Sequence, residues 1–180
     1  MTTAEDTRPG VNALRRELAH FRYSLFRLET FQRYSGSSED EAFAEWRRTG
    51  SLPRTDELRA WCEWIDQRIR EGCRAQRVHV VREPLTDYLR FELASYKPNV
   101  LAGEEVRIIP VSEGCWPTDV PAESDFWLVD GRSLWSMRYG HGGEWLGAQH
   151  VADPRQVVEA CTVRDAALAQ SVLWQDYHPR

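Results

Sequence analysis

The sequence predicts an α/β (α+β) fold with a mixed sheet, on the strength of three observations. Residues 74–110 follow a strand pattern, then a helix pattern, then a second strand pattern. Residues 125–148 contain short strand patterns separated by tight turns, which is typical of an antiparallel meander. The first 72 residues are mainly helical in pattern. We therefore expect a single domain over residues 1–180, with helices of the 1–72 part packed on a mixed-sheet core in residues 73–180.

The N-terminal part is expected to contain three helices. Apolar residues recur in steps of four and three from Leu14 to Leu28, which predicts an amphipathic helix over about residues 11–30. That helix could cover the core of its own chain or dock on a partner, as in a homodimer. Ser38 and Glu41 match the capping box that starts a second helix.

The second of these helices should end near Gly50, and a third should run from about Asp56 to a left-handed cap at Gly72. Strands are then expected at residues 77–81 and 105–110. In the first of them, Val78 and Val80 alternate with Arg77 and His79, the period-2 pattern of a half-buried strand. A parallel β-α-β crossover is the simplest way to join the two strands.

The connecting helix should begin at the Glu83-Pro84 break and end at Lys97-Pro98, because proline starts helices readily but cannot continue them. Glu92 lies on its apolar face, between Leu89 and Leu93. A buried carboxylate without a partner is costly. We therefore expect Glu92 to have a specific partner or a ligand.

The C-terminal half shows clear turn signals. Asp130-Gly131 predicts a β-hairpin, and the glycine-rich turn 140–143 leads into a third strand. Asp153 and Pro154 should open the final helix, as its cap and first residue. We expect the tail from Trp174 onward to be loosely held.

Composition excludes several classes of protein. With 42% hydrophobic and 28% charged residues and a mean hydropathy of -0.58, the chain is neither disordered nor a membrane protein in composition. The N-terminus lacks a secretory signal pattern, so we expect a cytoplasmic location. The net charge of -5 disfavours direct nucleic-acid binding. The four cysteines are scattered, so neither a disulfide framework nor a metal site is expected.

The recognised catalytic and cofactor-binding motifs are absent, so no cofactor is expected and no catalytic residue is assigned. The candidate site consists instead of charged residues at places where charge is costly, with aromatic neighbours. Two interpretations remain open. One is an internal salt-bridge network in which Arg107 or Arg77 holds Glu92; the other is a polar pocket for a small ligand, framed by Trp127 and Tyr139. The candidate residues are Arg77, His79, Glu92, Arg107, Asp125, Trp127 and Tyr139.

Four stretches resemble the actinobacterial DUF6879 family over nearly the whole chain: RLETFQRY, the run from Arg77 to Pro110, DFWLVDG, and the closing tail with its tryptophan and tyrosine. The resemblance implies a gene neighbourhood with helix-turn-helix regulators, and it supplies no catalytic residue. A fainter likeness is to the half-domain of phospholipase D-like folds. Its H-x-K motif is missing, because Lys97, the only lysine, follows Ser95-Tyr96.

These observations favour a non-enzymatic cytoplasmic accessory or regulatory protein, which binds a small ligand or a helix-turn-helix regulator. The alternative is a small metal-independent enzyme of specialised metabolism. It would use Glu92, His79 or Asp125 as acid or base near Arg107.

Overall fold

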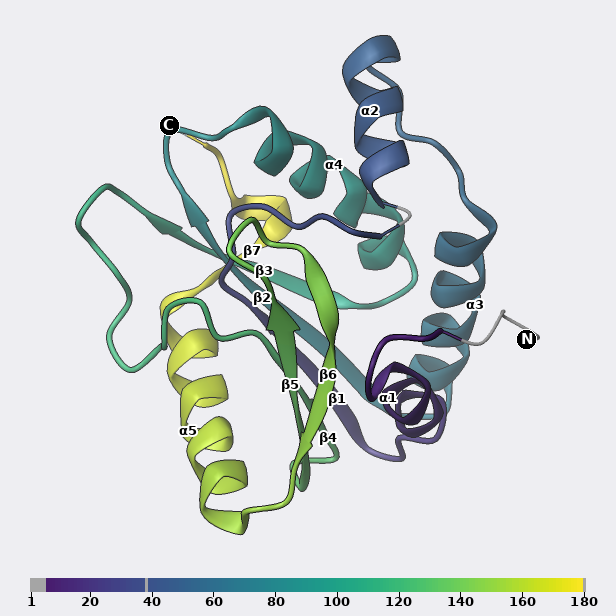
Figure 1. Cartoon of the computed structure of the whole chain (residues 1–180), viewed down its shortest axis with the longest axis vertical. Helices are drawn as coiled ribbons and strands as arrows, with labels where there is room; N and C mark the ends of the chain where they lie inside the picture. The colour runs from purple at the N-terminus through teal and green to yellow at the C-terminus, as the bar shows by residue number, and fades with distance from the viewer. Residues whose placement is uncertain (1–5, 38, 180) are drawn as a thin grey trace.

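A seven-stranded mixed sheet forms the centre of the computed structural model, which describes residues 6–37 and 39–179 (Figure 1). Helices cover both of its faces. The elements in chain order are α1 (Val11–Leu18), β1 (Ser24–Glu29), α2 (Glu39–Thr49), α3 (Asp56–Arg70), β2 (Arg74–Arg82), α4 (Asp87–Leu101), β3 (Glu105–Val111), β4 (Phe126–Val129), β5 (Ser133–Tyr139), β6 (Trp145–Val151), α5 (Pro154–Gln170), β7 (Val172–Leu173) and the 3-10 turn η1 (Trp174–Asp176).

The strand order is β6-β5-β4-β1-β2-β3-β7. β1, β2 and β3 are parallel, whereas β4, β5, β6 and β7 pair antiparallel to their neighbours. This confirms the predicted mixed sheet, its β2-α4-β3 crossover and the antiparallel meander. In the part of the chain that the structure describes, no helix is long and apolar enough to cross a membrane.

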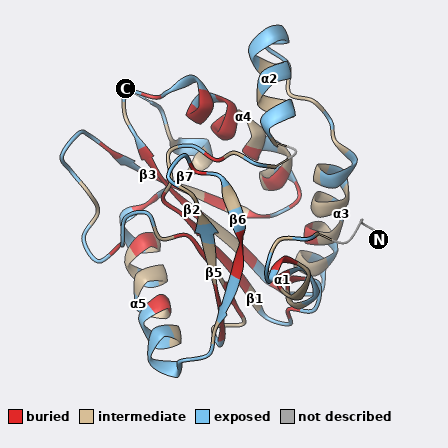
Figure 2. Ribbon diagram, in the orientation of Figure 1, coloured by how far each residue is buried: buried red, intermediate tan, exposed pale blue. Residues whose placement is uncertain are grey.

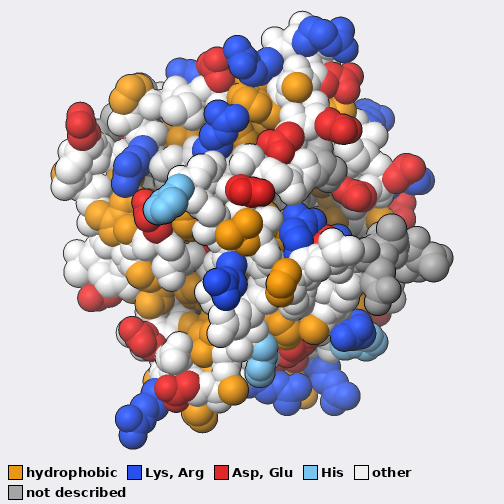
Figure 3. Space-filling view, viewed as in Figure 1, with side chains coloured by type: hydrophobic (Ala, Val, Ile, Leu, Met, Phe, Trp, Pro, Cys, Tyr) orange, Lys and Arg blue, Asp and Glu red, His pale blue; other side chains and the backbone are white. Residues whose placement is uncertain are grey.

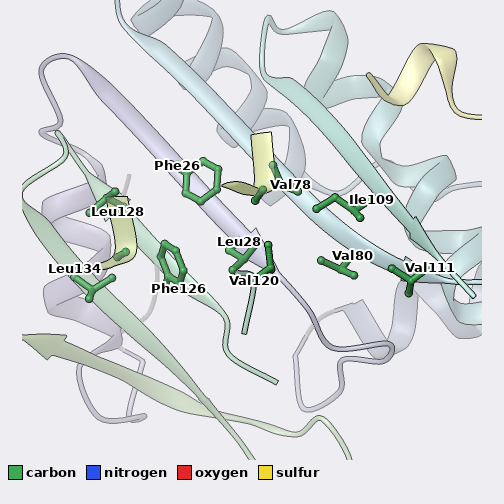
Figure 4. Close-up of a cluster of buried hydrophobic side chains, with 12 residues drawn as sticks. Phe26, Leu28, Val78, Val80, Ile109, Val111, Val120, Phe126, Leu128 and Leu134 are labelled. Carbon is green, nitrogen blue, oxygen red and sulfur yellow. The ribbon is translucent and has the colours of Figure 1, made fainter. Parts of the chain in front are cut away.

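Each face of the sheet has its own core. On one face α5 covers an apolar layer in which Phe26, Leu28, Val78 and Val80 lie side by side (Figure 4). α1 and α3 cover one part of the opposite face, and α4 covers another. α2 contributes no buried residue and stands out from the body of the molecule (Figures 1 and 2).

The predicted helix over residues 11–30 is wrong in its second half. α1 ends at Leu18, and residues 24–29 form β1 in the middle of the sheet. β1 is buried on both faces, and its alternation of apolar and charged residues is limited to residues 26–29 because Leu25 interrupts it. The spacing of its apolar residues continued the helical pattern by coincidence. The apolar side of α1 lies in the chain's own core.

The other helix boundaries follow the predictions with two corrections. α4 begins at Asp87, where Thr86 caps it by accepting from the Leu89 N–H, and not at the Glu83-Pro84 break. It also continues through Pro98 to Leu101. The last turn is held from outside the helix, because Asn99 donates from Nδ2 to Glu104 Oε2 at 2.7 Å and its carbonyl accepts from the Glu104 N–H.

The turn signals of the C-terminal half are confirmed. Asp130 and Gly131 both have positive φ, as a type I′ turn requires, and they join β4 to β5. Asp153 caps α5 by accepting from the Arg155 N–H, and Pro154 is its first residue.

α3 begins after a Thr55 cap and is followed by Gly72 at positive φ. The predicted cap at Ser38 lies outside the described residues.

The tail is docked on the sheet and not loosely held. β7 pairs with β3, and Trp174 Nε1 donates to the Leu93 carbonyl at 2.8 Å. The Tyr177 hydroxyl donates to Glu83 Oε1 at 2.9 Å. The tail thereby covers the outer edge of β3 and one side of α4.

We expect Trp174→Ala to lower the free energy of unfolding by about 1–3 kcal/mol, because it removes a half-buried ring and a hydrogen bond. Chemical denaturation measures the change. His178→Ala is the matched control in the same tail, since His178 is exposed, and it should stay within about 0.5 kcal/mol of the parent. Equal effects of the two substitutions would contradict the docked tail.

Candidate functional site

A network of buried charged groups lies on the face of the sheet opposite α5. It originates in the alternation of two neighbouring strands. Arg27 and Glu29 of β1 point to this face, and so do Arg77 and His79 of β2. The parallel register sets Arg27 beside Arg77 and Glu29 beside His79. Four polar side chains therefore meet where the sheet would otherwise be apolar.

Glu29 is the centre of the network. Its carboxylate accepts from Arg77 Nη1 at 2.9 and 2.8 Å and from Arg27 Nε at 3.3 Å. Burial by itself would raise the pKa of Glu29, but the two guanidinium groups outweigh it and hold the pKa far below the usual 4.5. Glu29 is therefore ionised throughout the physiological range.

Arg27 connects Glu29 to Asp125, the residue that precedes β4. Arg27 Nη2 donates to Asp125 Oδ2 at 3.1 Å and to the Tyr139 hydroxyl at 3.0 Å. Asp125 also accepts from the Tyr34 hydroxyl at 2.7 Å and from the backbone N–H and hydroxyl of Thr30. Burial raises the pKa of Asp125, and Arg27 opposes the rise. Asp125 thus ties three segments of the chain together.

Arg77 connects Glu29 to Glu104, the residue that precedes β3. Its Nε donates to Glu104 Oε1 at 2.8 Å, and Glu104 also accepts from Trp61 Nε1 at 3.3 Å. The centroid of the Trp127 ring lies 5.2 Å from the guanidinium carbon of Arg27 and 5.9 Å from that of Arg77. Aromatic faces of this kind stabilise guanidinium groups that have left water.

His79 contacts Glu92 through a tyrosine. Its Nε2 lies 3.2 Å from the Phe31 carbonyl, which can only accept, so Nε2 carries a proton. Its Nδ1 lies 2.8 Å from the Tyr96 hydroxyl oxygen. That oxygen is also 3.0 Å from Glu29 Oε2 and 2.9 Å from Glu92 Oε2. Burial lowers the pKa of His79, so the imidazole is neutral near pH 7 and Nδ1 is an acceptor.

Glu92 is the uncharged member of the network. Burial raises its pKa well above 4.5, and the nearby Glu39 and Glu29 carboxylates add to the rise. A protonated Glu92 can donate to the Tyr96 oxygen, which leaves the Tyr96 proton for His79 or Glu29. The second Glu92 oxygen lies 3.4 Å from the Tyr88 hydroxyl, and Tyr88 donates to Glu39 Oε1 at 2.8 Å. The network thus reaches the partly exposed start of α2.

The number of charges explains why Glu92 keeps its proton. Two guanidinium groups, of Arg27 and Arg77, face three buried carboxylates, of Glu29, Asp125 and Glu104. A further ionised carboxyl group would add to this negative excess. Among the described residues, Arg27 Nη1 is a buried donor without a hydrogen-bond partner. The other polar groups of the network form hydrogen bonds and ion pairs mainly with one another.

Six of the seven predicted site residues lie together. Arg77, His79, Glu92 and Asp125 belong to the network, Tyr139 hydrogen-bonds to it and Trp127 packs against it. Arg107 does not: it lies on the α5 face and donates to Ser171 Oγ at 2.8 Å and to Glu105 Oε1 at 3.0 Å.

The expected partner of Glu92 is therefore corrected. The Glu92 carboxyl group hydrogen-bonds to Tyr88 and Tyr96 and also interacts with Glu39, and among the described residues no ion pair joins it to Arg107 or Arg77. The imidazole of His79 lies 4.0 Å away. Helix spacing could have indicated these tyrosines, since Tyr88 and Tyr96 stand four residues before and after Glu92.

Sequence reasoning missed Arg27, Glu29 and Glu104. Arg27 and Glu29 alternate with Leu28 in the stretch LFRLE, and this was the available signal. It was concealed by the helical spacing of the same stretch. Glu104 follows a turn glycine and carried no signal of burial, although only 4% of its surface is exposed.

The described residues were also searched for a metal site, and the face shown in Figure 3 for a basic patch. Within residues 6–37 and 39–179, no group of three or more His, Cys, Asp or Glu side chains is placed to hold a metal ion. On the face shown in Figure 3, Lys and Arg side chains are interspersed with Asp and Glu. That face therefore offers no continuous basic patch for a phosphate backbone.

One of the comparisons with known proteins gives a match. The model of a family described as a domain of unknown function, DUF6879, matches residues 12–179 of the chain. No curated protein matches the sequence. The matched range contains the whole buried network.

Proposed function

We propose, from the premise that this chain belongs to the DUF6879 family, that it is a non-enzymatic cytoplasmic accessory protein whose partner is a helix-turn-helix regulator. The observation that supports the absence of catalysis is the engagement of every candidate acid and base within the network. His79 has no exposed surface, and both of its ring nitrogens contact protein groups. A general base must instead reach a substrate proton within hydrogen-bond distance.

The network suits a scaffold. Glu29, Arg27 and Arg77 join β1 to β2, and Asp125 joins β1 to the start of β4. Removing one member of a buried ion pair is costly, so such a network opposes sliding of these strands. A rigid body that presents its outer surface to a partner is the expected result.

Charge and gene neighbourhood support a regulator as the partner. Resemblance to the actinobacterial family implies that its members are encoded near helix-turn-helix regulators. Such proteins bind DNA through basic surfaces, which attract a chain of net charge -5. In this proposal the chain binds the regulator in the cytoplasm and contacts no nucleic acid itself.

We expect the purified chain to co-elute in size-exclusion chromatography with the helix-turn-helix regulator encoded nearest its gene. The complex should weaken as salt is raised, because screening reduces the attraction between the two charged surfaces. An unrelated helix-turn-helix regulator of similar charge is the control and should elute separately. Separate elution of the neighbouring regulator at low salt would contradict the proposal.

One observation favours the alternative of a small metal-independent enzyme. Burial keeps Glu92 protonated, and an uncharged carboxyl group is what a general acid requires. Its contact through Tyr88 to Glu39 brings that group toward the surface at α2. A metabolite mixture incubated with the parent chain and with Glu92→Gln, then analysed by mass spectrometry, separates the two functions. A product formed by the parent alone would establish the enzyme.

A further inference from the structure

A surface hollow of about 310 Å³ lies apart from the buried network, at the amino ends of β1 and β2 on the α5 face of the sheet. Phe26 and Leu128 form its apolar inner wall, since both side chains are buried in the core beneath α5. Leu168 of α5 closes one side. The hollow is therefore a concavity over apolar side chains that is open to water at its rim.

Two cationic side chains line this hollow. Arg74 is exposed, and its guanidinium makes no hydrogen bond or ion pair within the part of the chain that the structure describes. Arg164 donates from Nε to Asp165 Oδ1 at 2.8 Å, and among the described residues its two terminal nitrogens have no protein acceptor. With two guanidinium groups and one carboxylate, the hollow is locally positive in a chain of net charge -5.

The hollow is also lined by an aromatic ring, a glycine and an amide side chain. Tyr23 stands at the rim with 71% of its surface exposed, so its ring can lie against a bound molecule. Gly72 adds no side chain to the wall, and the space where a Cβ would project is open. Gln76 supplies an amide that already donates to Glu105 Oε2 at 3.2 Å.

We propose that this hollow binds a small molecule carrying a carboxylate or phosphate group, with Arg74 and Arg164 on the oxyanion and Tyr23 against the rest of the ligand. Guanidinium groups match both oxyanions through paired N–H donors. An apolar wall with a few convergent polar groups is the usual form of a small-ligand site. This proposal is independent of the regulator, because neither the network nor the proposed complex contributes to the hollow.

Inorganic phosphate and benzoate serve as separate probes, titrated into the full-length chain by isothermal calorimetry or by NMR. Binding of phosphate alone would identify a phosphate site, and tighter binding of benzoate would identify an aromatic carboxylate site. We expect one of them to bind in the millimolar range, which corresponds to about -4 kcal/mol. No binding of either probe at about 20 mM, well above that range, would overturn the proposal.

Four substitutions test where the probe binds. Arg74→Gln and Arg164→Gln should each lower the affinity for the probe by about five-fold or more, as expected for loss of a charge-assisted hydrogen bond. Arg59→Gln removes the same charge from an exposed residue paired with Asp56 and should leave the affinity unchanged. Asp165→Asn should tighten binding by about two- to five-fold, because it removes a repulsive carboxylate. Equal weakening by Arg74→Gln and Arg59→Gln would show a nonspecific charge effect and overturn the site.

Discussion

Glu29→Gln is expected to lower the free energy of unfolding by about 3–5 kcal/mol, because it leaves two buried guanidinium groups without their shared anion. Glutamine keeps one acceptor oxygen but places an NH2 donor where the other oxygen stood, so Arg77 Nη1 loses one of its two acceptor atoms and both guanidinium groups lose the negative charge that they share. Glutamine has nearly the same shape, so the loss reports charge and not packing. Urea denaturation at pH 7, with thermal unfolding as a second measure, gives the value.

Glu105→Gln is the matched control for this prediction. Glu105 also holds an arginine, Arg107, at 3.0 Å, but its carboxylate is 37% exposed. An ion pair in such a position contributes about 0–1 kcal/mol. The two variants thus make the same chemical change in a buried and in a half-exposed pair. Equal losses would mean that the buried network contributes no more than a surface pair.

The pH dependence of the stability of the parent and of Glu29→Gln gives an independent check. The folded-state pKa of Glu29 lies below its unfolded value, so its contribution is present above about pH 4.5 and is lost as the pH falls further. The stability difference between the parent and Glu29→Gln should therefore narrow below pH 4.5. A constant difference across this range would argue against an ionised Glu29.

Much of the fold could be predicted because its signals are local. The β2-α4-β3 unit alternates visibly, and the turn at Asp130-Gly131 needs positive φ angles that glycine and aspartate tolerate. β1 could not be predicted in the same way. A central strand buried on both faces shows only a short alternation, which here also fits helical spacing, so its identity depends on strands that lie far away in the sequence.

In the site, too, the residues with a local signal could be predicted, whereas those that depend on strand pairing could not. Arg77, His79 and Glu92 stood out because charge on an apolar face is visible within one element. Their partners did not, because a partner depends on which strands are neighbours and in what register. Glu29 meets His79 and Arg77 only through the parallel pairing of β1 with β2. Once β1 was assigned to a helix, the predicted partners of Glu92 were Arg107 and Arg77, the arginines on the two predicted strands, although Arg107 faces the other side of the sheet.

Glu92→Gln is expected to leave the chain as stable as the parent at pH 5 and about 1–3 kcal/mol more stable at pH 7–8. The folded-state pKa of Glu92 is raised above 4.5 by burial and by Glu39, so the folded chain keeps a proton that the unfolded chain releases. The stability of the parent must then fall as the pH rises above about 4.5. Glutamine has nothing to ionise, and its amide can still donate to the Tyr96 oxygen.

The measurement is the free energy of unfolding of both chains between pH 5 and 8. The neutral His79 acts in the opposite direction: burial lowers its pKa, so its contribution is lost as the pH falls below about 6.5. It is present in both chains and cancels in their difference. The difference in free energy of unfolding between the two chains should grow as the pH rises from 5 to 8. A Glu92→Gln chain that is less stable than the parent at pH 8 would mean that Glu92 is an ionised, paired carboxylate. The assignment of Glu92 as a protonated carboxyl group would then be wrong.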